Sequence, residues 1–184
     1  MKSAFSLQVG FSWDWGGLIQ TAYNYIEPAE IDKLDYYARY PNNQFWLLCL
    51  VSLFKFVKLF VGNAEIHFYK HFTMVVSVII MQIAIEFIYR SAKVIFSPKK
   101  AFFTGIITLF FAPLYLYAEF FYTDIPCVLT VSIMMFLYFK MQKAESVKFK
   151  IILYILFGIV GAFSFLIKIN SFIVFVAILI GMIF

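Results

Sequence analysis

The sequence contains few charged residues. Of its 184 residues, 14% are charged and 64% are apolar, whereas a soluble domain has about 25% charged and 45–50% apolar residues. Phe, Tyr and Trp make up 22% of the chain, which is more apolar surface than a single core buries. Several uncharged runs approach the roughly 20 residues that span a bilayer. These features exclude a soluble globular domain and indicate a membrane protein.

Strand-length alternation of apolar and polar residues is also lacking. In lipid, each unpaired backbone group is energetically costly, so a chain without such alternation crosses as helices. We therefore expect an all-α fold, a multi-pass integral membrane helical bundle with two short interfacial helices near the N-terminus.

Cysteine is scarce, and common nucleotide and metal motifs are missing. Cys49 and Cys127 lie in apolar runs, which gives neither a disulfide framework nor a metal-ligand spacing. His67 and His71 lack a third ligand and are expected in a loop. The sequence has no P-loop, no Gly-rich dinucleotide motif, no HExxH and no Ser/His/Asp order. These residues predict no metal site.

Two regions are predicted. Residues 1–43 mix charges with Trp and Tyr, which is typical of the headgroup level, and form an external interfacial region with helices over 17–26 and 29–40. Residues 44–184 form the transmembrane region of five to six apolar segments. The segments cover 43–60, 72–89, 101–118 with a kink at Pro113, a short 125–139, 151–167 and an unfinished 171–184.

Basic residues gather in the later loops. Residues 90–100 hold Arg90 and three lysines, and 140–150 hold four lysines, which suits the cytoplasmic side of a membrane better than nucleic-acid binding. Strict alternation of all segments from an external N-terminal region places both loops outside. One apolar segment therefore does not cross, and 43–60 and 101–118 both remain candidates.

Asp14 is the first candidate catalytic group. It stands between two tryptophans, ahead of an amphipathic helix at the membrane surface. A carboxylate held there acts as a general base, or it caps the helix that follows. The sequence leaves both interpretations open.

Three further polar residues interrupt the apolar segments. Glu119 and Asp124 flank a short turn, and they either cap the next helix or sit in a wet cavity. Lys168 divides two apolar stretches and is either a hairpin tip or a polar site within the bundle. A lysine at an external tip suits an anionic phosphate.

A polar stripe and a cluster of small residues favour helix packing. Gln82, Glu86 and Arg90 follow at i, i+4 and i+8 and are expected to pair with neighbouring helices. Gly158 and Gly161 predict close helix contacts.

Four short motifs in order resemble a known family. They are Ser12-Trp13-Asp14-Trp15, Tyr40-Pro41-Asn42-Asn43, Phe121-Tyr122-Thr123-Asp124 and Lys168-Ile169-Asn170. The set resembles membrane glycosyltransferases of the GT-C superfamily, in particular the protein O-mannosyltransferases and lipid A aminoarabinose transferases of the glycosyltransferase 39-like branch.

The resemblance implies a hexosyl- or pentosyltransferase that uses a polyprenyl-phosphate-linked sugar as donor. The active site would face the outside of the plasma membrane, and an unidentified glycan or protein would be the acceptor. Transfer to the acceptor hydroxyl would invert the anomeric carbon, and a divalent metal stays an open question. The implied catalytic residues are Asp14 and Asp124, and the implied substrate- and phosphate-binding residues are Lys168, Arg39, Glu119, Tyr40, Asn42 and Asn43.

The chain departs from this family in extent. Family members begin with a transmembrane helix before the first aspartate and continue beyond the last apolar segment, so we expect a fragment that is inactive alone. Two alternatives remain: a transporter or flippase segment in which Glu86, Arg90 and Lys168 line a path, and a non-catalytic membrane assembly protein.

Overall fold

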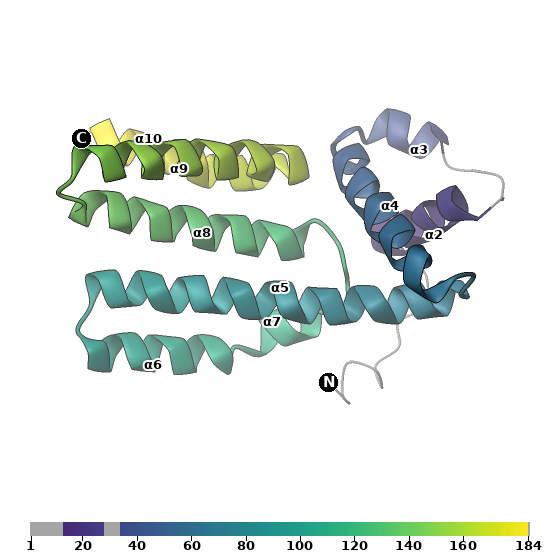
Figure 1. Cartoon of the computed structure of the whole chain (residues 1–184), viewed down its shortest axis with the longest axis horizontal. Helices are drawn as coiled ribbons and strands as arrows, with labels where there is room; N and C mark the ends of the chain where they lie inside the picture. Colours follow the sequence, from purple (N-terminus) through teal and green to yellow (C-terminus); the bar gives the residue numbers. More distant parts are fainter. Residues whose placement is uncertain (1–12, 28–33, 184) are drawn as a thin grey trace.

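The computed structural model describes residues 13–27 and 34–183, and the regular elements of these residues are all helices (Figure 1). The all-α prediction is confirmed. The helices are α2 (Trp13–Ile26), α3 (Leu34–Arg39), α4 (Asn42–Val61), α5 (Ile66–Ile95), α6 (Pro98–Leu109), α7 (Ala112–Tyr117), α8 (Asp124–Lys143), α9 (Val147–Ile167) and α10 (Ile169–Ile183).

Four of these helices, α4, α5, α8 and α9, are long and apolar enough to cross a membrane. The segment predicted as short, 125–139, is a full-length helix of 20 residues. It continues through Lys140 and Lys143 because a lysine at a helix end extends its aliphatic stem along apolar surface and places its ammonium in water. The chain is thus a multi-pass membrane protein built from a helical bundle.

Helices α5, α8, α9 and α10 lie side by side with their long axes aligned, and α6 runs back along α5 (Figure 1). Met134 and Leu137 of α8 pack against Leu153 and Phe157 of α9 in the core of this bundle. Gly161 is a close-packing position, as predicted, because an added Cβ would overlap the Phe175 ring of α10. The same prediction is wrong for Gly158, which has nothing within 4 Å of such a Cβ.

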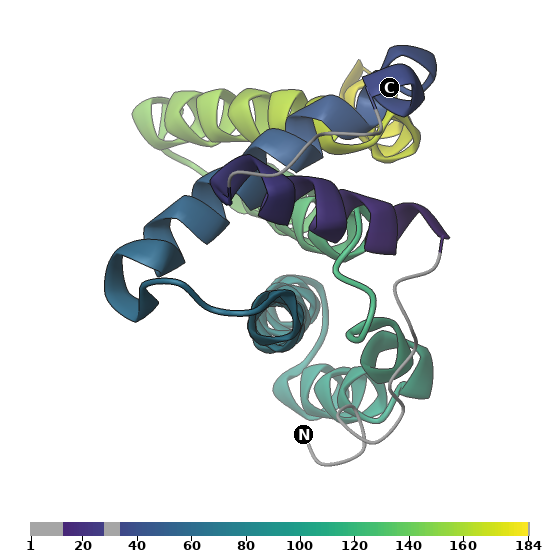
Figure 2. The same ribbon diagram turned by 90° about the vertical axis from the view of Figure 1, so that its right-hand side faces the viewer.

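Helices α2, α3 and α4 gather at one end of the bundle, and we call them the crosswise layer. Figures 1 and 2 show that α4 lies across the bundle end rather than alongside α5. Leu18 and Ile19 of α2 and Leu50 and Phe54 of α4 are fully buried against Tyr69 of α5. The Lys58 ammonium of α4 also forms an ion pair with Glu27, directly after α2, at 2.8 Å. Apolar packing and an ion pair therefore both hold α4 against α2.

The segment 101–118 is two helices and not one kinked helix. Helix α6 ends at Leu109, and Pro113 lies in the first turn of α7. Proline has no amide hydrogen and is favoured where a helix begins, so it starts a new helix here instead of bending an existing one.

Two other local predictions are wrong. Helix α2 starts at Trp13, four residues before the predicted start, and Asp14 lies in its first turn, where a negative charge is favoured by the helix dipole. His67 and His71 belong to the first turns of α5 and not to a loop.

The basic loops share one end of the molecule. The α5–α6 and α8–α9 connections both lie at the end opposite the crosswise layer (Figure 1). Lys99 and Lys100 follow the first connection, and Lys143 and Lys148 flank the second. The Asp124 and Lys168 ends of their helices therefore face the crosswise layer.

Candidate active site

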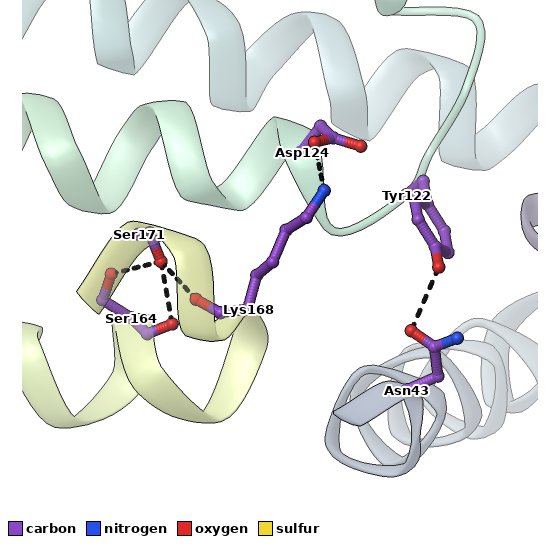
Figure 3. A network of polar contacts seen from close by, with 6 residues as sticks. All are labelled: Asn43, Tyr122, Asp124, Ser164, Lys168 and Ser171. Carbon is purple, nitrogen blue, oxygen red and sulfur yellow. Dashed lines mark hydrogen bonds and ion pairs between the residues drawn. The ribbon is translucent and has the colours of Figure 1, made fainter. Parts of the chain in front are cut away.

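Asp124 and Lys168 form an ion pair. Lys168 Nζ lies 2.5 Å from Asp124 Oδ1, with the side chains 28% and 47% exposed respectively. Asp124 is the first residue of α8, and Lys168 has an extended backbone in the one-residue break between α9 and α10. Figure 3 shows the lysine reaching from the break to the start of α8. Lys168 is therefore both the hairpin tip and a polar site of the bundle end.

Asp14 and Asp124 share one cavity. It has a volume of about 290 Å³, and we call it the carboxylate cavity. The described residues that line it are Asp14, Trp15, Tyr117, Phe120, Tyr122 and Asp124. The fold thus brings together the two aspartates that the sequence analysis singled out, with aromatic rings between them.

Trp15 fixes the helix turn that carries Asp14. Its side chain is 3% exposed, and its ring meets the Phe120 ring edge to face with centroids 5.6 Å apart. The Lys70 ammonium of α5 lies 5.6 Å from the Trp15 ring centroid, within range of a cation–π contact. Asp14 itself is exposed, so a buried neighbour holds a carboxylate that remains open to solvent.

Asn43 joins two tyrosines beside the cavity. Its side chain is 2% exposed, its Nδ2 donates to the Tyr36 hydroxyl at 2.8 Å, and its Oδ1 accepts from the Tyr122 hydroxyl at 3.1 Å. Tyr36 is also hydrogen-bonded to Asp14. The chain of contacts connects α2, α3, α4 and the α7–α8 loop.

Both tyrosines are held in the protonated form. Burial raises the pKa of Tyr36 well above its usual range, and the hydrogen bond and negative charge of Asp14 act in the same direction. Burial also raises the pKa of Tyr122, against the opposing effect of its bond to Asn43. The two hydroxyls therefore remain hydrogen-bond donors at neutral pH.

A second, apolar cavity of about 560 Å³ lies between α5, α8 and α10. Ile88, Val128, Val131 and Val174 line its walls, and Asp124 and Lys168 line it as well. Because Asp124 borders both cavities, the ion pair stands where a polar, aromatic space meets an apolar one. A ligand with a sugar, a charged group and an acyl or prenyl chain matches this sequence of environments.

Three other predicted site residues, Arg39, Tyr40 and Glu119, line neither of these two cavities. Arg39 and Tyr40 are exposed at the end of α3, and Glu119 is buried in the α7–α8 loop. Asn42 begins α4, and its side chain falls outside the described part of the structure. Of the predicted set, the fold thus collects Asp14, Asp124, Lys168 and, through tyrosines, Asn43.

Two capping interpretations are wrong. Asp14 lies inside the first turn of α2 rather than at its N-cap. Thr123 precedes α8 without a side-chain cap bond, and Asp124 lies within the helix and pairs with Lys168 instead.

The predicted pairing of Glu86 and Arg90 with neighbouring helices is wrong too. They bond to each other at 2.7 Å along one helix face, both half exposed, because an i, i+4 spacing places opposite charges side by side.

Sequence reasoning missed Tyr36, Lys70 and the individual role of Tyr122. Tyrosines are abundant in the first 40 residues, so their number conceals the one that contacts Asp14. Lys70 is only 4% exposed, and its position among apolar residues at the start of α5 was a signal that a buried cation was present.

Comparison with known proteins gives one match. Residues 62–184, about two thirds of the chain, match the family described as dolichyl-phosphate-mannose-protein mannosyltransferase. The match includes Asp124 and Lys168 and begins after Asp14 and Asn43. No curated protein and no solved structure matches the chain. The chain therefore belongs to the dolichyl-phosphate-mannose-protein mannosyltransferase family.

Proposed function

We propose that the chain contributes the active site of a membrane glycosyltransferase that moves a sugar from a polyprenyl-phosphate carrier to an acceptor hydroxyl. The single observation that carries this proposal is the position of Asp124. It shares an aromatic-lined cavity with Asp14, and it pairs with Lys168 at the edge of a larger apolar cavity. Family membership supports a lipid-linked donor.

The chemistry is a direct displacement. The acceptor oxygen attacks the anomeric carbon, the bond from that carbon to the phosphate oxygen breaks, and Asp14 takes the acceptor proton as general base. The polyprenyl phosphate leaves with the bonding electrons. One displacement inverts the configuration at the anomeric carbon.

Lys168 stabilises the departing phosphate. An ammonium has three donors, so it serves a phosphate oxygen while it keeps its contact with Asp124. In a site that excludes water, this charge is worth more than in bulk solvent. Asp124 holds the lysine at the junction of the cavities and accepts hydrogen bonds from the sugar hydroxyls.

The site faces the outside of the plasma membrane. Basic loops of membrane proteins stay in the cytoplasm, and the two lysine-rich connections lie at the end opposite α2 (Figure 1). Helix α2 carries Asp14, which lines the carboxylate cavity. Because α4 lies crosswise, we take it as the segment that does not cross and place it at the external interface. This arrangement removes the conflict between strict alternation and the distribution of lysines.

The test is sugar transfer in native membranes by the protein that contains this chain, with polyprenyl-phosphate mannose as the first donor. Asp14→Asn is expected to lower the rate by about 10² to 10⁴, the usual contribution of a general base. Glu145→Gln removes an exposed acid from the α8–α9 loop at the opposite end and is the matched control. Full activity of the Asp14 variant at equal expression would end the assignment.

A further inference from the structure

Three buried hydroxyl side chains meet where α9 gives way to α10. Thr130, Ser164 and Ser171 are 8%, 0% and 6% exposed. Ser164 Oγ donates to Ser171 Oγ at 2.7 Å, and Thr130 Oγ1 lies 3.3 Å from Ser164 Oγ. We call these residues the hydroxyl cluster. Burying polar groups in an apolar bundle is unfavourable unless they bond to one another, and here they do.

The cluster contacts the backbone of Lys168 through Ser171. Ser171 Oγ lies 2.7 Å from the Lys168 carbonyl oxygen and 3.0 Å from that of Ser164. The Lys168 amide donates to the Ser164 carbonyl at 3.0 Å, and the Ser171 amide donates to the Lys168 carbonyl at 3.1 Å. Both carbonyls already accept from an amide, so the Ser171 hydroxyl adds a second bond to the backbone at the break between α9 and α10. Figure 3 shows Ser164 and Ser171 close together on one side of the Lys168 backbone, with the lysine side chain extending away from them.

Thr130 connects this break to the helix that carries Asp124. It lies in the second turn of α8, and its single hydroxyl hydrogen is within reach of two acceptors, the Cys127 carbonyl at 3.1 Å and Ser164 Oγ at 3.3 Å. The cluster therefore connects the α9–α10 break, which carries Lys168, to α8, which begins at Asp124. The 2.5 Å contact between Lys168 and Asp124 depends on that relation.

Close packing of α9 and α10 does not require hydroxyl groups at these three positions. Gly161 and Phe175 already bring α9 and α10 into close contact, and Phe157 and Phe175 stack with centroids 4.8 Å apart. An alanine or valine in place of each hydroxyl would fill much of the same volume. What the hydroxyls add is a fixed backbone direction at one residue, Lys168.

We propose that Ser171, with Ser164 and Thr130, acts as a set of positioning residues that aim the Lys168 ammonium at the phosphate of a polyprenyl-phosphate ligand. The inference rests on the proposed function for the role of Lys168 toward phosphate. None of the three hydroxyls takes part in a bond-breaking step. Their effect passes through the lysine, and this dependence can be measured.

The experiment measures binding of sugar-free polyprenyl phosphate to the full chain in nanodiscs. Ser171→Ala is expected to weaken binding about tenfold, because a catalytic group displaced by as little as about 1 Å loses much of its effect. Ser171→Thr keeps the hydroxyl and is expected to restore binding. The control is Ser77→Ala, since Ser77 is a buried serine of α5 with no hydrogen-bond partner among the described residues.

A double-mutant cycle separates positioning from general stability. In a Lys168→Met background, Ser171→Ala is expected to cause no further loss, because residues that act through one another are non-additive. An equal loss in both backgrounds would overturn the proposal, as would unchanged binding by Ser171→Ala. Thr130→Val is a second test in case Ser171→Ala does not accumulate in the membrane. It must weaken binding of polyprenyl phosphate when Lys168 is present and cause no further loss in the Lys168→Met background.

The two proposals fail differently. If the chain binds polyprenyl phosphate but the protein that contains it transfers no sugar in native membranes, the proposed function fails and the positioning role stands on the binding data. If the native chain does not bind polyprenyl phosphate, the positioning role is overturned.

Discussion

The Tyr122 hydroxyl donates a hydrogen bond to Asn43 Oδ1 at 3.1 Å (Figure 3). Tyr122 precedes α8 in the bundle, and Asn43 lies in the first turn of α4 in the crosswise layer. The bond therefore joins the part of the chain that holds Asp14 to the part that holds Asp124 and Lys168. A single amide, satisfied on both its oxygen and its nitrogen, sets how the two halves of the candidate site meet.

The first prediction concerns this amide. Asn43→Ala removes the acceptor of the Tyr122 hydroxyl and the amide that donates to the Tyr36 hydroxyl, and an unsatisfied buried donor or acceptor costs about 1–3 kcal/mol. We expect a lower midpoint of thermal unfolding in detergent and a reduced transfer rate. Gln44→Ala is the control, because the adjacent Gln44 is exposed and bonds only the Tyr37 carbonyl among the contacts found for its side chain. Equal effects of the two substitutions would contradict the role of Asn43.

The second prediction uses the two glycines of α9. An alanine at Gly161 places its Cβ against the Phe175 ring, which stacks between Phe157 and Phe172. Overpacking of this kind costs about 1–3 kcal/mol, so Gly161→Ala is expected to lower the free energy of unfolding. Gly158→Ala meets open space and is expected to stay within about 1 kcal/mol of the native chain, since alanine is the better helix former. Reversed effects would show that α9 and α10 do not pack as described.

Much of the fold was predictable from local sequence. Apolar runs marked α4, α8 and α9, and Gly161 marked a close helix contact, because helix length and residue size are properties of the segment itself. The placement of α4 was not predictable. Its 20 residues have the length and hydropathy of a spanning helix, and only its packing against α2 and α5 shows that it lies crosswise.

The candidate site divides in the same way. Asp14, Asp124 and Lys168 stood out individually because ionisable residues beside long apolar runs are rare. Their common cavity depends on the positions of α2, α8 and the α9–α10 break, which no local pattern encodes. Tyr36 was missed because one tyrosine among several at an interface carries no distinguishing sequence signal.

The third prediction tests the crosswise helix and the orientation of the site together. After Cys49 and Cys127 are replaced by alanine, single cysteines are introduced at the exposed positions Ala38, Asn63 and Glu145. Ala38 and Asn63 lie beyond opposite ends of α4, and Glu145 lies in the α8–α9 loop.

A membrane-impermeant maleimide applied to intact cells is expected to label the cysteines at positions 38 and 63 and to label position 145 only after permeabilisation. A spanning α4 would place 38 and 63 on opposite sides of the membrane, so labelling of only one of them in intact cells would refute the crosswise placement. Labelling of 145 in intact cells, with 38 and 63 protected, would place the carboxylate cavity in the cytoplasm. An externally delivered lipid-linked sugar would then not reach Asp14, and the proposed reaction would lose its donor.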